Sequence, residues 1–352
     1  MRAAPTRSAT VTPTGVVVAP PNLDREQWLT VRRAGVGGSD VAAVLGMSKY
    51  TSAREVYLDK RGELPLDRPQ NPELAEAAFW GLAHEPTIAR VFSERSGLAV
   101  VTGPGMLAHI ERRWMLANVD RYVLDEDAQP SSLLEIKTRS AYQLDDWLLG
   151  VPDGPALQTH WYLAVTGYQH AHVAALLGGN RLLIHRVERD EGLVEHLVDL
   201  VGEFWQGVLD GTPPPVDGSE ATEELLGHLY KVKADAVTVA DPADVLPLLE
   251  RRRELKAREA RTADELREVD NHLKALAGEA EIVKTRGKVA FTWKQNGPLS
   301  VKRFTTAHPD LATTYTHRVE ALDTKRLAAE HPDEYRAHRA RRLVVPKEPA
   351  AA

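Results

Sequence analysis

The chain has 352 residues, which is enough for one good-sized hydrophobic core and an appendage. It contains no cysteine, and this excludes disulfides, thiolate zinc sites and iron–sulfur clusters. Its net charge of −6 argues at first against nucleic-acid binding, because Lys and Arg make the contacts to phosphates.

Residues 1–21 are rich in Ala, Thr, Pro and Val. They lack the basic start and apolar core of a signal peptide. No apolar run in the chain reaches the ~18 to 20 residues that span a bilayer. We therefore expect a disordered arm on a cytoplasmic protein that makes no membrane contact.

Residues 22–217 alternate helical and strand patterns. This alternation predicts an α/β domain with a central mixed sheet flanked by helices. The Gly-Thr-Pro-Pro-Pro run at 211–215 predicts the end of that domain. Residues 218–240 have no clear pattern, and we expect them to form a linker.

Near the start of this domain, Arg32 precedes the sequence Gly-Gly-Ser-Asp at 37–40. The glycines let the backbone approach a ligand, and Ser39 or Asp40 is expected to cap the helix that follows. The first amides of such a helix suit an anion. The alternative is a capped helix beside a solvated arginine, and the residues alone favour it.

A helical pattern covers about residues 72–96 and carries Glu85 on its apolar face, between Leu82 and Ile88. Pro86 can kink or restart the helix, which loosens this spacing. A carboxylate on an apolar face is costly unless it binds a cation or a hydrogen-bond donor. The alternative is an edge residue whose carboxylate reaches water.

Two strands are predicted next, one around Asp120 and one over residues 132–138. Side chains alternate along a strand, so Glu135 and Lys137 should share one face. The acid-rich stretch 125–130 predicts a hairpin loop, which makes the two strands sheet neighbours.

Two carboxylates and a lysine would then converge on one point. Oxygen ligands of this kind suit Mg²⁺ or Mn²⁺ together with a substrate phosphate, an arrangement that can hydrolyse phosphodiesters. A solvated strand face with alternating Glu and Lys is the alternative, because a motif this short also arises by chance.

Gln158 and Tyr162 lie one helical turn apart and so share a face. On their own they are ordinary polar residues of a helix. His170 and His172 have strand-like spacing and no acidic or histidine partner nearby, so we interpret both as structural rather than as zinc ligands.

Residues 241–280 are rich in Leu, Glu, Arg and Lys, which predicts a long charged helix. Apolar residues recur along it every seven positions, with Gly278 as a plausible stop. One seam contains Leu248, Leu255, Thr262, Val269 and Leu276, and the second contains Arg252, Glu259, Leu266 and Leu273. The polar interruptions make a weak heptad, so we expect packing on the same chain rather than an obligate dimer.

Residues 281–352 carry 14 Lys and Arg against 8 Asp and Glu, a net charge of +6 that leaves −12 for residues 1–280. We expect a strand at 288–294, a helical stretch at 324–336 and a basic end at 339–343 in a helical and small α/β appendage. The positive tail is a candidate for phosphate contacts, and a solvated basic surface is the alternative.

From residue 24 to about 217 the chain resembles the YqaJ-like viral recombinases, relatives of lambda exonuclease in the PD-(D/E)xK nuclease superfamily. The matching motifs follow one another along the chain at 28–33, 37–40, 45–50, 57–62, 80–85, 118–120, 134–138, 151–152, 158–163 and 165–167. This resemblance implies a restriction-endonuclease-like core. Relatives often have a small residue and Pro before the aspartate, whereas this chain has Asn118 and Val119.

The resemblance also implies residue roles. Asp120, Glu135 and the backbone carbonyl of Ile136 would bind Mg²⁺, with Mn²⁺ able to substitute, and Glu85 would join them. Lys137 and Gln158 would be catalytic, and Arg32 and Ser39 would hold a terminal 5′-phosphate.

The activity implied is a 5′-to-3′ exonuclease that acts on duplex DNA with a free end and leaves 3′ single strands for phage-type recombination. Its partner would be a single-strand annealing recombinase, and a homo-oligomer is compatible with the sequence. Two alternatives stay open: a structure-specific endonuclease or nickase of the same fold, and a non-catalytic DNA-binding or assembly module.

Overall fold

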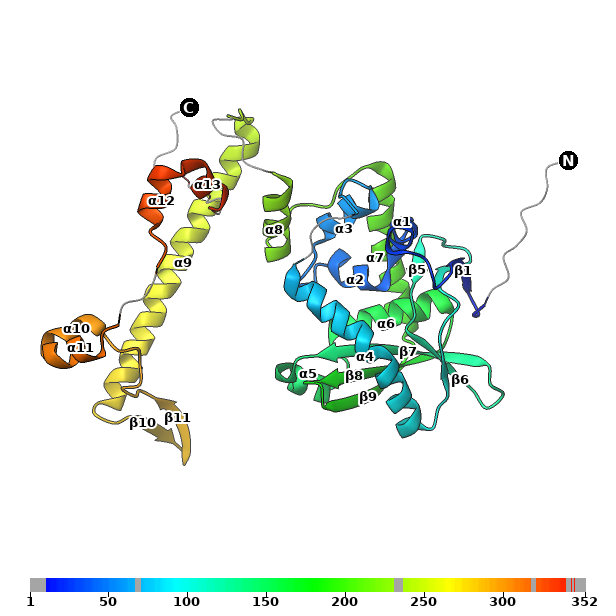
Figure 1. Cartoon of the computed structure of the whole chain (residues 1–352), viewed down its shortest axis with the longest axis horizontal. Helices are drawn as coiled ribbons and strands as arrows, with labels where there is room; N and C mark the ends of the chain where they lie inside the picture. The colour runs from blue at the N-terminus through cyan, green and yellow to red at the C-terminus, as the bar shows by residue number, and fades with distance from the viewer. Residues whose placement is uncertain are drawn as a thin grey trace. The chain divides into compact units, whose positions relative to one another are not determined.

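The structure is a computed structural model that describes residues 11–66, 71–230, 237–317, 321–339, 343 and 345. It divides into two units, Met1–Lys231 and Val232–Ala352. Figure 1 shows the order of their helices and strands along the chain. Within the described ranges, no helix is long and apolar enough to cross a membrane.

A five-stranded sheet in the order β3-β6-β7-β8-β9 lies at the centre of the first unit. Its strands are β3 (Val100–Val101), β6 (Arg121–Leu124), β7 (Pro130–Arg139), β8 (His170–Leu177) and β9 (Arg181–Glu188). Because β7 pairs with β8 in parallel and the other pairs are antiparallel, the sheet is mixed. The predicted mixed α/β fold and the predicted hairpin between β6 and β7 are both confirmed.

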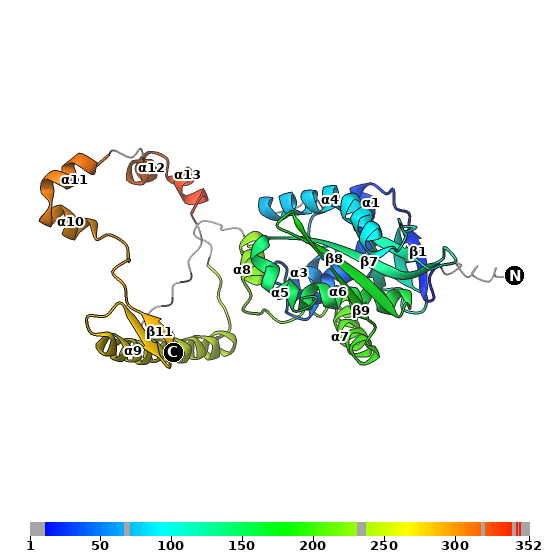
Figure 2. The same ribbon diagram turned by 90° about the horizontal axis from the view of Figure 1, so that it is seen from below.

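Two helices cover the faces of this sheet, α4 (Pro72–Ser96) on one side and α6 (Asp153–Thr166) on the other (Figure 2). Under α4, Phe92 and Ile88 pack against Leu134 and Ile136 of β7. The α6 face buries a separate cluster that includes Trp161 and Leu133. The alternation along β7 therefore sends its apolar side chains to both cores and leaves the end of its α6 face for polar ones.

A second sheet of four strands has the order β1-β4-β5-β2. Its strands are β1 (Gly15–Ala19), β4 (Met106–His109), β5 (Met115–Ala117) and β2 (Val36–Gly37). The expected disordered arm is therefore wrong for residues 15–19, because β1 pairs antiparallel with β4 and buries Val16 and Ala19. Residues 1–10 lie outside the described ranges.

The remaining elements of the first unit are helical. They are α1 (Arg25–Arg33), α2 (Gly38–Val44), α3 (Ala53–Lys60), the 3-10 turn Ala141–Gln143, α5 (Leu144–Leu148), α7 (Glu191–Asp210) and α8 (Glu220–Leu229). Gly211 ends α7 in the left-handed conformation, φ +74. The expected linker is wrong at 220–229, because Leu225 of α8 packs into a buried cluster with Tyr57 and Val208.

The second unit begins with the 36-residue helix α9 (Pro242–Ala277), close to the predicted 241–280. A two-stranded sheet of β10 (Ile282–Thr285) and β11 (Lys288–Thr292) follows, then α10 (Val301–Ala307) and α11 (Pro309–Tyr315). The predicted helix 324–336 is instead two helices, α12 (Thr324–Glu330) and α13 (Pro332–Ala337). The break comes at His331, since Pro332 cannot continue a helix. Of the predicted basic end, residues 340–342 lie outside the described ranges.

Candidate active site

Glu135 and Lys137 project from the same face of β7, as the strand alternation predicts. The ammonium Nζ of Lys137 pairs with Glu135 Oε1. Both side chains are largely buried, at 4% exposed for Glu135 and 14% for Lys137. Two charged groups are therefore held at the end of a central strand with little water to screen them.

Asp120 reaches this cluster from the turn before β6 and not from within a strand, so the predicted strand through residue 120 is wrong in its first half. Arg121, the first residue of β6, is paired with Leu134 of β7, and the pairing of the two strands stops there. Asp120 Oδ2 then accepts a hydrogen bond from the backbone N–H of Ile136 at 2.7 Å. The carboxylate thus replaces a backbone acceptor where the strand pairing stops, and this fixes it beside Glu135 and Lys137.

Gln158 of α6 completes the cluster from the facing helix. Its Nε2 donates to Glu135 Oε1 at 2.9 Å and to the Tyr162 hydroxyl at 3.0 Å, and its Oε1 accepts from Lys137 Nζ at 2.9 Å. The predicted shared face of Gln158 and Tyr162 is confirmed. Gly38 makes this arrangement possible, because an added Cβ there would lie 2.5 Å from the Tyr162 ring and 3.0 Å from Gln158 Cγ.

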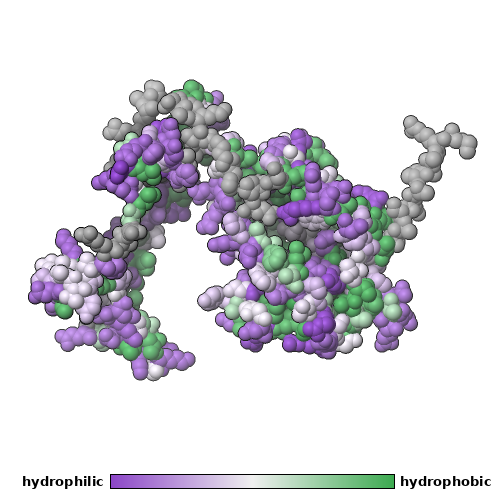
Figure 3. Space-filling view, in the orientation of Figure 1, coloured by the Kyte–Doolittle hydropathy of each residue, from purple (hydrophilic) through white to green (hydrophobic). Residues whose placement is uncertain are grey.

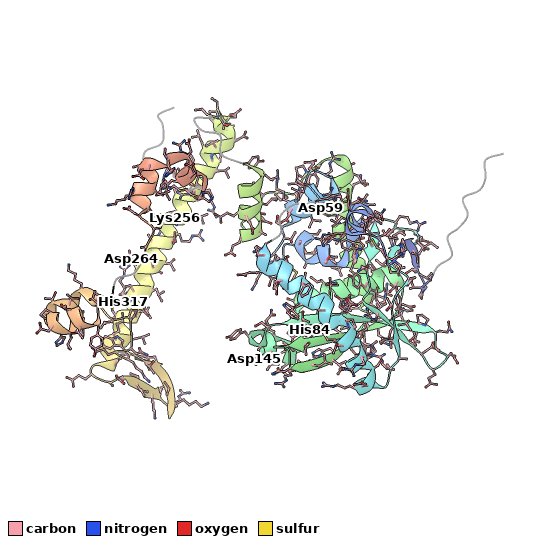
Figure 4. The ribbon with its side chains drawn as sticks, in the orientation of Figure 1. Asp59, His84, Asp145, Lys256, Asp264 and His317 are labelled. Carbon is pink, nitrogen blue, oxygen red and sulfur yellow. The ribbon has the colours of Figure 1, made fainter. Side chains whose placement is uncertain are left out.

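Glu85 lies nearby, one residue after His84, which Figure 4 labels on α4. Its carboxylate forms an ion pair with Arg121. A carboxylate on an apolar helix face was expected to bind either a cation or a hydrogen-bond donor, and Arg121 is that donor. Glu85, Asp120, Ile136 and Lys137 line one pocket of about 330 Å³. The sequence did not point to Arg121 as the partner of Glu85.

Electrostatics at the cluster disfavour its negative charges. Burial, and then the neighbouring Glu135 carboxylate, raise the pKa of Asp120 well above its usual range, although Lys137 and the Ile136 N–H oppose this. Burial, followed by Glu135 and Asp120, also raises the pKa of Tyr162, which keeps its hydroxyl protonated at neutral pH. Negative charge thus exceeds positive charge at this point, which favours a bound cation.

The donor set fits a hard divalent cation held by few protein ligands. Within the described residues, Glu135 Oε2 is buried and has no hydrogen-bond partner. A buried carboxylate oxygen without a donor is costly, and a cation would relieve that cost. The described residues contain no cluster of three or more His, Cys, Asp or Glu side chains that could hold a metal. Asp120, Glu135 and a backbone carbonyl would therefore have to be completed by water and substrate oxygens, as Mg²⁺ commonly is.

A second cluster surrounds Arg32, which donates to Ser39 Oγ at 3.1 Å and forms an ion pair with Asp40. The expected cap is confirmed for Asp40, which acts as the third residue of a capping box and not as the N-cap residue itself. Gly37 is the N-cap of α2, and Asp40 accepts the Gly37 N–H from the third helical position at 3.1 Å. The Asp40 carboxylate therefore already interacts with the arginine and with the start of the helix.

Lys60 of α3 lies beneath this cluster with its side chain 0% exposed. Its Nζ lies 2.8 Å from Asp40 Oδ2 and donates to the Arg32 carbonyl at 3.0 Å. Burial raises the pKa of Asp40, but Arg32 and Lys60 outweigh it, so the net pKa is lowered. The sequence motif at 57–62 contains Lys60. Its role as the buried partner of the Asp40 carboxylate is seen only in the structure.

A pocket of about 530 Å³ opens beside this cluster. Three arginines line it: Arg25, Arg32 and Arg33. Arg33 is engaged by Asp59, labelled in Figure 4, with hydrogen bonds of 2.9 and 3.1 Å. Asp40, Glu55 and Asp59 line the same pocket, so three carboxylates balance its three arginines.

The histidines of β8 lie apart from both clusters. His172 packs edge-on against Phe92 at a centroid distance of 5.4 Å and next to His170 at 5.6 Å. In the described part of the chain, neither belongs to a group of three or more side chains that could hold a metal ion.

Comparison with known proteins shows what this part of the chain is similar to. Residues 27–169 match the model of the YqaJ-like viral recombinase domain, so this range is similar to that domain. All four residues of the Asp120, Glu135, Lys137 and Gln158 cluster lie within the matched range.

Among curated proteins, the uncharacterized protein YqaJ of Bacillus subtilis (strain 168) is 39% identical over 212 residues. The match covers 59% of this chain and 64% of that protein. Among solved structures, an alkaline exonuclease (LHK-Exo) from Laribacter hongkongensis is 20% identical with a TM-score of 0.43, over 58% of this chain and 100% of that one. A phage related exonuclease from Haemophilus somnus 129PT is 10% identical with a TM-score of 0.38, over 50% and 96%.

Proposed function

We propose that this protein is a Mg²⁺-dependent deoxyribonuclease that digests duplex DNA from its 5′ ends and leaves a 3′ single strand for an annealing recombinase. The observation that carries the proposal is the hydrogen-bonded cluster of Asp120, Glu135, Lys137 and Gln158, in which one buried carboxylate oxygen lacks a partner. The YqaJ-like domain supports the choice of DNA as substrate and of recombination as the setting.

In this mechanism Asp120, Glu135 and the Ile136 carbonyl would hold the cation, with Glu85 beside them. When bound, the cation supplies Lewis-acid polarisation of the scissile phosphate. The Lys137 ammonium would orient the attacking water and counter the negative charge that develops on the phosphate, and it would deprotonate that water only after giving up a proton of its own. Its ammonium is held between Glu135 and Gln158, so this group is positioned before substrate arrives.

The decisive experiment compares a linear duplex labelled at one 5′ end with a closed circle of the same sequence, with Mg²⁺, with Mn²⁺ and with a chelator. The proposal expects release of label from the linear duplex, an intact circle and no activity with the chelator. Nicking of the circle would establish the endonuclease alternative. Binding to both DNAs without cleavage would indicate the non-catalytic alternative.

Matched variants assign the chemistry to this cluster. Asp120→Ala and Glu135→Ala should abolish hydrolysis and weaken metal binding, measured by calorimetry. Lys137→Ala should abolish hydrolysis while nearly keeping metal affinity, because metal binding and base catalysis are separate functions. A Lys137→Ala protein with near wild-type turnover would overturn the mechanism.

A further inference from the structure

The long helix α9 exposes a stripe of apolar side chains that Arg252, Glu259 and Thr262 interrupt. Within the described residues of the second unit its apolar seam side chains are 37–75% exposed, and the expected packing on the same chain stays a prediction. These side chains are Leu248, Leu255, Leu266, Val269, Leu273 and Leu276. The space-filling view shows apolar and hydrophilic residues interspersed along this helix (Figure 3). Such a stripe is a candidate interaction surface, because burying apolar area is favourable.

The other faces of α9 are charged and exposed to solvent. Ion pairs between residues three positions apart line the helix, including Arg251 with Glu254 at 3.0 Å and Arg267 with Asp264 at 2.8 Å. Lys256 pairs with Glu259 at 2.6 Å, and Figure 4 labels Lys256 and Asp264 on this helix. Exposed pairs of this kind support a solvated helix but add little stability. Among the described residues of the second unit, the apolar stripe is therefore the face of α9 that no other segment covers.

We propose that a second copy of this chain covers the stripe, with the two α9 helices antiparallel. A parallel, in-register pair is opposed by charge. It would place Arg252 against the partner's Arg252 and Glu259 against the partner's Glu259, both inside the seam. Like charges directly opposed in a seam disfavour that pairing, and heptad proteins use this effect to select orientation.

Reversing one helix removes those conflicts. In the register that aligns the apolar positions, Leu255 packs against the partner's Leu266, and Leu248 against the partner's Leu273. Arg258 then flanks the partner's Glu265, and each pairing occurs twice by symmetry. Within the described residues, neither Arg258 nor Glu265 forms an ion pair in its own chain, so both are available to the partner.

The length of the stripe suits such a pairing. From Leu248 to Leu276 it runs through four heptads, and the whole 36-residue helix spans about 54 Å at a rise of about 1.5 Å per residue. Three to four heptads are about the length at which an a/d pattern indicates a coiled coil. This inference rests on the second unit alone and does not depend on the proposed nuclease activity.

Cysteine cross-linking of the full-length protein tests the pairing directly, because the chain has no cysteine of its own. Leu255→Cys and Leu266→Cys proteins, one of them tagged, are mixed and oxidised gently. The antiparallel register expects the mixed disulfide in large excess over both homodimers. Predominant homodimers would indicate a parallel pair, and absence of any disulfide would show that the stripe is not paired; either result overturns the proposal.

A charge-swap series measured by analytical ultracentrifugation provides an independent test. Arg258→Glu and Glu265→Arg should each raise the dissociation constant, and the double variant should restore it. Leu255→Glu should raise it by at least about tenfold, since it places a charge in the seam. Leu246→Glu, which changes an exposed leucine off the stripe, is the matched control and should leave it unchanged. Because all four positions are exposed, circular dichroism should show unaltered helix content.

An unchanged mass for Leu255→Glu, or no rescue in the double variant, would refute the pairing. Nuclease activity is not the readout, so failure here leaves the proposed function standing. A variant that changes the rate of DNA cleavage but not the mass in the ultracentrifuge likewise tests only the proposed nuclease activity and not the pairing of the helices.

Discussion

Gln158 connects Glu135 and Lys137 in the cluster, because its amide donates to Glu135 and accepts from Lys137. We predict that Gln158→Ala lowers kcat by ~10 to 100-fold with little change in KM, the range typical of groups that orient metal ligands. Tyr162→Phe removes only the hydroxyl that Gln158 also contacts, so it serves as the matched control with a much smaller loss. Equal losses in both variants would mean that helix packing, and not the amide, is responsible.

His172 gives the fold a pH dependence. Burial, and then His170 and Arg186, lower its pKa from 6.5 to about 4. In the unfolded chain the His172 imidazole is protonated below about pH 6.5, whereas in the folded chain it is protonated only below about pH 4. The free energy of unfolding therefore decreases as the pH falls from 6.5 to about 4. Urea unfolding at pH 7.5, 6 and 5 should show this loss, and His172→Gln should reduce it. His196→Gln, at an exposed position, should leave the loss unchanged, and a pH profile identical in all three proteins would contradict the assignment.

Some of the contacts between side chains could be predicted from spacing along the sequence, and others could not. The shared face of Glu135 and Lys137 follows from the strict two-residue period of a strand, and the shared face of Gln158 and Tyr162 from the helical turn. The Arg121 partner of Glu85 and the Lys60 beneath Asp40 could not be predicted in this way. Each contact joins elements whose approach depends on tertiary packing, and local spacing carries no information about that.

At the scale of elements, α2 approaches α6 closely because Gly38 has no side chain. An added Cβ would lie 2.5 Å from the Tyr162 ring. Gly38→Ala should therefore lower the free energy of unfolding by ~1 to 3 kcal/mol, as overpacking does, and should reduce cleavage by shifting Gln158. Gly154→Ala, on the same helix as Gln158 with open space around it, should be neutral or stabilising by ~0.4 to 1 kcal/mol. Chemical denaturation of both variants decides whether the contact matters.

The junction of α1 and α2 carries the predicted end sensor. A terminal phosphate has more negative charge than a diester, so Arg32 should favour 5′-phosphorylated ends through hydrogen bonds worth ~1.5 to 3 kcal/mol, or roughly tenfold or more in rate. Arg32→Ala and Ser39→Ala should reduce that preference in initial rates on matched 5′-phosphate and 5′-hydroxyl duplexes. Arg25→Ala, which changes another arginine of the same pocket, is the control. A wild type without preference would leave Arg32 with a purely structural role beside Asp40.

The ends of helices could be predicted where the sequence has capping residues, proline or glycine at them. The helix α4 matches its predicted range because Asn71 caps it, Pro72 starts it and Gly97 ends it in the left-handed conformation. The short elements β1 and α8 were not predicted. Five residues of strand and ten of helix are marginal alone, and both depend on distant partners such as β4 and α3.

At the scale of the whole molecule, charge is divided unevenly between the two units. Acidic residues predominate in residues 1–280, whereas residues 281–352 are net positive. If DNA is the substrate, the positive segment offers phosphate contacts in addition to those proposed for the first unit. This division could be predicted from composition alone, because it needs no contact to be known.

The last prediction tests that segment. A protein shortened to end at Lys231 keeps α8, whose Leu225 packs in the first unit, so the domain should stay folded. It should bind duplex DNA more weakly and with a shallower dependence on salt, by about 0.9 in log–log slope for each DNA phosphate that the tail no longer neutralises. Fluorescence anisotropy from low to moderate salt measures both quantities.

Shortening the chain also removes α9, and with it any pairing of two copies, so charge must be separated from dimer formation. A full-length protein with Lys302, Arg303, Lys325 and Arg326 all changed to Gln keeps α9 and removes only four positive charges. If phosphate contacts explain the weaker binding, this variant should show the shallower slope while its mass in the ultracentrifuge stays that of the wild type. A slope unchanged in the Gln variant but reduced in the shortened protein would instead assign the effect to the joining of two DNA-binding domains, since linked sites bind more tightly without any new contact.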